Sequence, residues 1–253
     1  MSARHIGSKS FRKVPELTVY FWIIKILTTA MGESTSDYLD HRISPVFAVL
    51  VAGLILIVAF AIQFSIHMYI AWAYWFTVVM VAVFGTMLAD GIHVKLGVPY
   101  LISTIFFAIV LIVIFRLWHK SEKTLSIHSI YTTRREVYYW AAVMVTFALG
   151  TAAGDMTATT LGLGYFTSGL MFTAIFAVPA IAYWLFGINE IFAFWFAYIM
   201  TRPLGASFAD WIGVPRSLGG LGFGRGTVSI ILTVIIIFFV AYISFTREDA
   251  KSK

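Results

Sequence analysis

Four aspartates recur in this chain at a fixed distance from a tryptophan and a glycine. In each case a glycine follows the tryptophan by 10 residues, and an aspartate follows it by 15. The aspartates are Asp37, Asp90, Asp155 and Asp210, the tryptophans Trp22, Trp75, Trp140 and Trp195, and the glycines Gly32, Gly85, Gly150 and Gly205. Because chance does not produce such agreement in four segments, the spacing indicates four tandem repeats.

The repeated aspartates are the first candidates for chemistry. If the four repeat helices run in the same direction, their carboxylates lie at one level, about 22 Å along the helix from the tryptophans. Four carboxylates at one level repel one another unless a cation, protons or basic partners neutralise them. The alternative is that each aspartate lies in headgroup water or caps the turn that follows it.

The first repeat carries more charge than the other three. Lys25, Thr29, Glu33 and Asp37 follow one another at intervals of four residues, so they share one helix face. The position of Glu33 is occupied in the other repeats by Thr86, Thr151 and Ala206. A lysine this deep in a membrane helix costs roughly 2.5–3.5 kcal/mol, so we expect an acid beside Lys25.

Arg202 occupies, in the fourth repeat, the position that Thr29 has in the first, and it offers a counter-charge from another helix. We predict an ion-binding site formed by Glu33, Asp37, Asp90, Asp155 and Asp210, with Lys25 and Arg202 tuning its charge. Oxygen ligands without thiols suit a proton or a hard divalent metal ion such as Mn²⁺. His41 and His93 lie near the same end, where a loop histidine is more often simply solvated.

Small residues accompany each aspartate. The residue before it, four positions after the repeat glycine, is Ser36, Ala89, Gly154 or Ala209. In lipid, stripes of small residues let helices approach closely, so we expect the four repeat helices to pack on one another. For the tryptophans we expect interfacial anchoring or packing, with an aromatic gate as the alternative.

Composition excludes several classes of protein. Hydrophobic residues make up 60% of the 253 residues and charged residues only 12%, whereas soluble domains carry about a quarter charged residues. The absence of cysteine excludes disulfides, thiolate metal sites and cysteine nucleophiles. The net charge of +6 is typical of basic loops in a membrane protein, and we expect no nucleic-acid partner. No nucleophile–base pair is evident, so we expect no enzymatic activity.

Eight segments are long and apolar enough to be membrane helices. They lie at 16–37, 46–66, 69–90, 98–118, 136–156, 162–186, 190–211 and 227–246. The predicted fold is all-α, a polytopic membrane protein with eight transmembrane helices from four tandem helical hairpins, in two four-helix halves joined by a basic linker at 116–136. We expect a single transmembrane domain over 1–253, with repeats at approximately 14–66, 67–118, 132–186 and 187–246. The glycine-rich run from Gly219 to Gly226 is typical of a flexible outer loop.

The distribution of basic residues predicts the orientation. Of the 18 lysines and arginines, 12 lie on the side of the two termini and the linker, 5 lie on the other side, and Lys25 lies within a span. The positive-inside rule therefore places both termini and the linker in the cytoplasm.

Three sequence segments carry a resemblance to a known family: Lys13 to Glu16, Tyr20 to Lys25, and Gly32 to Leu39. The chain resembles a family of bacterial membrane proteins of unknown function, in which four tandem repeats each contain two transmembrane segments and a characteristic tryptophan. The resemblance covers nearly the whole chain. It implies eight membrane helices in a bacterial inner membrane and no defined activity.

These observations favour a membrane transporter or exchanger of a small cation. The alternative is a non-transporting sensor, assembly factor or partner-binding protein in which the repeated glycines and aspartates are structural. We expect the lipid bilayer and a small cation as partners, and no cofactor other than such a bound cation. The sequence leaves open whether the chain forms a homo-oligomer.

Overall fold

The computed structural model describes residues 12–248, apart from the side chains at positions 94 and 95. In this part of the chain, eight long helices are present and strands are absent, which confirms the predicted all-α fold. The helices are α1 (Val19–Arg42), α2 (Pro45–Ser65), α3 (Ala71–Asp90), α4 (Tyr100–Glu122), α5 (Thr133–Asp155), α6 (Gly164–Phe186), α7 (Glu190–Gly213) and α8 (Arg225–Thr246).

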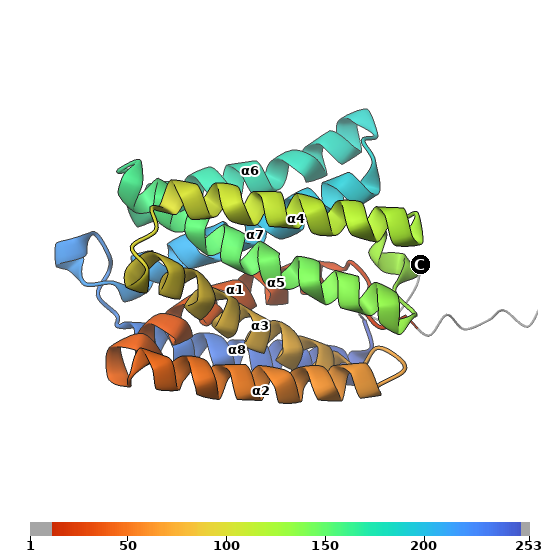
Figure 1. Cartoon of the computed structure of the whole chain (residues 1–253), viewed down its shortest axis with the longest axis horizontal. Coiled ribbons are helices and arrows are strands. Elements are labelled where there is room, and N and C mark those ends of the chain that lie inside the picture. The colour runs from red at the N-terminus through yellow and green to blue at the C-terminus, as the bar shows by residue number, and fades with distance from the viewer. Residues whose placement is uncertain (1–11, 249–253) are drawn as a thin grey trace, which may run out of the picture.

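The four odd-numbered helices form an inner ring. Along this ring α1 contacts α3, α3 contacts α5, α5 contacts α7, and α7 returns to contact α1. The even-numbered helices lie outside, with α4 and α6 on one side of the inner helices and α2 and α8 on the other (Figure 1). Each outer helix packs mainly on the inner helix of the following repeat, and α8 packs on α1. The two halves defined by the sequence therefore belong to one continuous ring.

The repeat glycines lie where neighbouring inner helices approach most closely. A Cβ atom at Gly32 would lie 2.5 Å from Ala82 Cβ on α3, and one at Gly85 would lie 2.8 Å from Phe147 Cβ on α5. Cβ atoms at the other two positions would collide with the next ring member in the same way, at Arg202 for Gly150 and at Thr29 for Gly205. The stripes of small residues thus bring the inner helices together, as expected for helices that pack without a hydrophobic driving force.

The repeat tryptophans close the ring at its other end. Trp75, Trp140 and Trp195 are buried, whereas Trp22 is half-buried, so their main role is packing. The aromatic residue that precedes each tryptophan packs on the tryptophan of the next repeat. These ring pairs are Phe21–Trp75, Tyr74–Trp140, Tyr139–Trp195 and Phe194–Trp22, with centroid distances of 5.7, 5.5, 6.1 and 6.0 Å.

The outer helices present an apolar surface to the bilayer. Six helices in the described chain are long and apolar enough to cross a membrane, namely α2, α3, α4, α5, α6 and α8. The two that fall outside this set, α1 and α7, carry Lys25, Glu33 and Arg202, and all three side chains are buried in the bundle. Because the outer helices shield these charges from lipid, the protein is a membrane protein with a polar interior.

Both ends of the described chain lie at the end of the bundle that carries the α4–α5 linker. The backbone N–H of Lys13 donates to Ile130 O of the linker at 2.9 Å, and the rings of Tyr20 and Tyr242 are 5.4 Å apart. This agrees with an even number of crossings. Four of the basic residues in the orientation argument, Arg4, Lys9, Lys251 and Lys253, lie outside the described residues.

Candidate functional site

A cavity of about 640 Å³ lies at the end of the inner ring that carries the repeat aspartates, called here the aspartate end. All four of these aspartates line it, together with Glu33. The structure therefore brings together all five residues of the predicted ion-binding set. Parallel inner helices with one repeated spacing place the carboxyl groups at the same level, and the ring arrangement turns them toward a common space.

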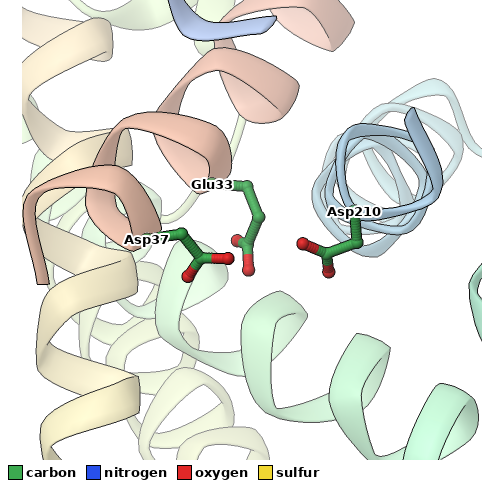
Figure 2. A group of neighbouring side chains, drawn as sticks. All are labelled: Glu33, Asp37 and Asp210. Atoms are coloured by element: carbon green, nitrogen blue, oxygen red, sulfur yellow. The ribbon is translucent and has the colours of Figure 1, made fainter. Parts of the chain in front are cut away.

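Three of the carboxylates form a tighter group. Glu33 and Asp37 extend from α1 toward Asp210 on α7, as Figure 2 shows, and one oxygen of each lies within 4.8 Å of the others. Asp90 and Asp155 line the same cavity but lie outside this group. The helices α1 and α7 are neighbours in the ring, and of the inner helices only α1 carries a glutamate, Glu33, one turn before its repeat aspartate.

Arg202 forms the floor beneath Glu33. Its Nη2 donates to Glu33 Oε2 at 2.5 Å, to Thr151 Oγ1 at 2.7 Å and to Thr86 Oγ1. Thr86 and Thr151 hold the Glu33 position in the second and third repeats, so one side chain of the fourth repeat joins the equivalent positions of the other three. Gly150 leaves the space that the Arg202 side chain occupies. The predicted counter-charge is therefore present, as a fully buried ion pair.

Lys25 does not have the acidic partner that its depth predicted, and that prediction is wrong. Its Nζ has no hydrogen-bond partner among the described residues and lies over the rings of Phe147 and Tyr198, 4.0 and 4.2 Å from their centroids. Glu33, the expected partner, is engaged by Arg202. Cation–π contact replaces an ion pair here because the repeat positions around Lys25 supply aromatic rings and no carboxylate.

Beyond Lys25 the ring is closed by aromatic side chains. The hydroxyl groups of Tyr74 and Tyr139 are 2.5 Å apart, and both side chains are 1% exposed. Phe21 packs on Tyr198 and Phe194 at the same end. The aspartate cavity is therefore separated from the opposite end by Arg202, Lys25 and an aromatic layer.

Arg225, the first residue of α8, is a cavity residue that the sequence did not identify. Its Nε lies 2.7 Å from Asp37 Oδ2, and its Nη1 lies 3.2 Å from His41 Nε2. His41 also contacts the backbone oxygen of Asp37 through Nδ1 at 2.6 Å. Of the two histidines considered in the sequence analysis, His41 lines the cavity. His93 packs on Tyr100, and its Nδ1 lies 3.2 Å from the backbone oxygen of Val98.

The glycine-rich run positions Arg225. Its backbone N–H groups donate to carbonyls at the end of α7, from Leu221 to Trp211 O at 2.7 Å and from Gly224 to Gly213 O at 3.1 Å. Gly219, Gly222 and Gly224 have φ angles of +86°, +80° and +85°, a region that glycine enters without strain. The run expected to be a flexible loop thus caps α7, in the way that orphan helix carbonyls require.

The first residues of the outer helices complete the cavity wall. Pro45 of α2, Tyr100 of α4, Tyr165 of α6 and Arg225 of α8 all line it. The N-termini of these four helices therefore lie at the same level as the ends of α3 and α5, at Asp90 and Asp155, so helix-dipole ends of opposite sign meet at the cavity.

Asp90 and Asp155 do not act as side-chain caps of the turns that follow. α3 and α5 continue past Asp90 and Asp155 into wide π-helical turns, Gly91–Lys95 and Met156–Thr160, and neither aspartate makes a capping hydrogen bond. One oxygen of Asp90, Oδ2, is buried and has no hydrogen-bond partner in the described chain. Capping therefore does not explain why Asp90 and Asp155 face the cavity.

A family model matches the chain four times, at residues 20–69, 73–124, 138–189 and 193–249, and its description is Repeat of Unknown Function (DUF347). The chain therefore belongs to this family, which confirms the resemblance to a four-repeat family of unknown function. No curated protein and no solved structure matches the chain.

Proposed function

We propose that the protein is a membrane transporter or exchanger of a small, hard cation that binds in the aspartate cavity. The observation that carries this proposal is the convergence of Glu33 and the four repeat aspartates on one cavity. Intramembrane carboxylates that face a cavity mark ion and proton pathways in membrane proteins.

The charge balance of the cavity supports a cation. Six carboxyl groups line it, those of Glu33, Asp37, Asp40, Asp90, Asp155 and Asp210, whereas two guanidinium groups, those of Arg202 and Arg225, are paired with Glu33 and Asp37. In a cavity surrounded by apolar helices, the excess negative charge requires bound cations or protons.

The spacing of the oxygens supports a hard ion. Two ligands of one ion lie at most twice the metal–oxygen distance apart, about 4.2 Å for Mg²⁺ and about 5 Å for Ca²⁺. The group of Glu33, Asp37 and Asp210, with oxygens within 4.8 Å, already suits the larger ion. A small inward movement would suit Mn²⁺ or Mg²⁺. Because all three ligands are carboxylates, copper and zinc are poorer candidates.

The orientation and location belong to the same proposal. The basic residues near the linker favour an orientation with the tryptophan end in the cytoplasm and the aspartate cavity on the outer side, and the repeat family resemblance favours a bacterial inner membrane. In this arrangement the cavity faces outward, and transport requires a second state in which the floor at Arg202 opens.

The test is cation flux into proteoliposomes across a panel of Mn²⁺, Mg²⁺, Ca²⁺, Na⁺ and H⁺. We expect Asp210→Asn, Asp37→Asn and Glu33→Gln to lower flux of the transported ion at least about tenfold, the equivalent of one lost ligand interaction. Glu190→Gln is the matched control, because Glu190 is an exposed carboxylate on α7 outside the cavity. Equal flux in wild type, control and site variants would remove these residues from the mechanism.

A second candidate function is a non-transporting sensor or assembly protein that binds the same cation. The layers of Arg202, Lys25 and aromatic rings favour it, because these buried side chains separate the cavity from the tryptophan end in the described part of the chain. Calorimetric cation binding that the site variants abolish, in a protein without flux, would support this second candidate over transport.

A further inference from the structure

Lys25 is a buried side chain that the cation site does not use. It is 1% exposed, and its Nζ has no hydrogen-bond partner among the described residues. From α1 the side chain extends to α5 and α7, where Nζ contacts the rings of Phe147 and Tyr198. An ammonium group repels any cation that the carboxylates bind. A lysine two helical turns from Glu33 therefore opposes cation binding unless it can lose its charge.

The inner helices around Lys25 supply one positive charge and no carboxylate at its level or one helical turn to either side. The repeat spacing identifies the residues at these three levels. Their only other charged member is Arg202, whose guanidinium carbon lies 5.6 Å from the centroid of the same phenylalanine ring. The remaining titratable members are three tyrosines, Tyr74 on α3, Tyr139 on α5 and Tyr198 on α7. The ammonium group therefore has a cation beside it and no anion to hold its proton.

A divalent cation in the cavity and the positive charge of Lys25 oppose each other. Glu33 follows Lys25 by eight residues, about 12 Å by helical rise. At an effective dielectric constant of about 20, a divalent ion at that distance disfavours the ammonium form by about a hundredfold. Arg202 cannot respond, because a guanidinium group keeps its proton in proteins, whereas a buried lysine can lose it. Cation entry therefore favours release of the Lys25 proton, and by linkage that proton weakens cation binding by the same factor.

We propose that Lys25 carries the proton that this protein exchanges for its cation, an inference that rests on the cation function proposed above. In the cation-free protein Lys25 is an ammonium ion. When a divalent cation binds at Glu33, Asp37 and Asp210, Lys25 releases one proton to water and becomes a neutral amine. When the cation leaves, the amine takes up one proton again. Each exchange thus adds one positive charge to the interior instead of two, and the carboxylates select the ion while the lysine couples it to protons.

Calorimetric titration of the full-length protein with Mn²⁺ tests the proposal. Titrations at pH 7 in buffers of different ionisation enthalpy give the number of protons released for each ion bound. Lys25→Met has no proton to release, so we expect about one proton fewer than in wild type. We also expect its affinity for Mn²⁺ to rise, by up to about a hundredfold, because the repulsion is gone. Lys120→Met is the matched control, since Lys120 is an exposed lysine of α4 outside the cavity, and it behaves as wild type.

Lys25→Arg provides the second comparison, because its charge is permanent. We expect it to release about one proton fewer than wild type, like Lys25→Met, but to bind Mn²⁺ more weakly than wild type. Equal proton release by wild type and Lys25→Met would mean that Lys25 stays charged and only offsets the carboxylates. That result would overturn the proposal and leave the cation site intact. If the wild-type protein binds none of Mn²⁺, Mg²⁺ and Ca²⁺, the proposed cation function and the exchange both fail.

Discussion

The two ends of the inner ring are built from the same four helices, yet one is solid and the other hollow. At the tryptophan end, each repeat contributes an aromatic pair that packs on its neighbour, and the side chains of Tyr74, Trp75 and Tyr139 are almost completely buried. At the aspartate end, each repeat contributes a carboxyl group, and a cavity of about 640 Å³ remains between them.

The difference follows from the chemistry of the repeated side chain. Aromatic rings attract one another in tilted and edge-to-face arrangements, so four equivalent copies can fill the axis of a ring. Four equivalent carboxylates repel one another and cannot fill it. The repeated aromatic residues therefore fill one end of the ring, and the repeated aspartates leave the other end open. The non-equivalent residues between them, Glu33, Lys25 and Arg202, define where the solid part ends.

The largest expected effect of a substitution on stability is at this boundary, at Arg202. Arg202→Met leaves Glu33 as a buried, unpaired carboxylate, and we expect the free energy of unfolding in detergent to fall by about 3–5 kcal/mol. Arg202→Lys keeps a charge, but the lysine side chain is shorter and does not extend to the position of Nη2, the atom that contacts Glu33, Thr86 and Thr151, so its loss is intermediate. A loss below about 1 kcal/mol for Arg202→Met would show that the ion pair does not join the repeats.

Lys25 lies closer to the tryptophan end than Arg202 does. Here we expect a substitution to raise the free energy of unfolding. Its ammonium has aromatic contacts and no hydrogen-bond acceptor, so Lys25→Met removes an expensive charge and keeps the volume. Stability rises by about 1–3 kcal/mol, the cost of a central lysine less the lost cation–π contacts. Denaturant unfolding in the same detergent measures it. A destabilised Lys25→Met protein would mean that the ammonium has a polar partner in the membrane.

The smallest expected effect lies within the solid end. Tyr74→Phe removes one hydroxyl of the buried Tyr74–Tyr139 pair and leaves the other without its partner, at a cost of about 1 kcal/mol. The double variant Tyr74→Phe with Tyr139→Phe removes both hydroxyls and is closer to wild type in unfolding experiments. If the two single losses simply add in the double variant, the hydroxyls do not bond to each other.

The repeated spacing was enough to predict the inner ring and the level of its carboxylates. Helical rise fixes how far Asp37 lies from Trp22, and the small residues predict close packing, so both follow from counting along the chain. The sequence also placed Arg202 on another helix as a counter-charge to the acids, and the structure pairs it with Glu33.

Some contacts depend on how a helix is rotated about its axis and on how far its side chains extend. These contacts could not be predicted by counting along the chain. Thr86 and Thr151 were recognised as equivalents of Glu33, but only the closed ring shows that one guanidinium reaches all three. Arg225 follows a glycine-rich run whose path is set by hydrogen bonds to α7, and the sequence contains no periodic signal for such a path. For Lys25, its depth in the helix predicted an acidic partner. The sequence did not show that the neighbouring helices place aromatic rings around it.

The fourth repeat packs on the first, so the ring of repeats has no beginning and no end. Open repeat arrays have terminal units that need a special capping sequence and can gain or lose units. Here Gly205 and Phe194 meet α1 as their equivalents meet the next helix, so no repeat is terminal and the number of repeats is fixed at four. The start of α1 and the end of α8 also lie side by side. A circularly permuted chain, opened in the α4–α5 linker and joined between these ends, therefore keeps every contact of the ring.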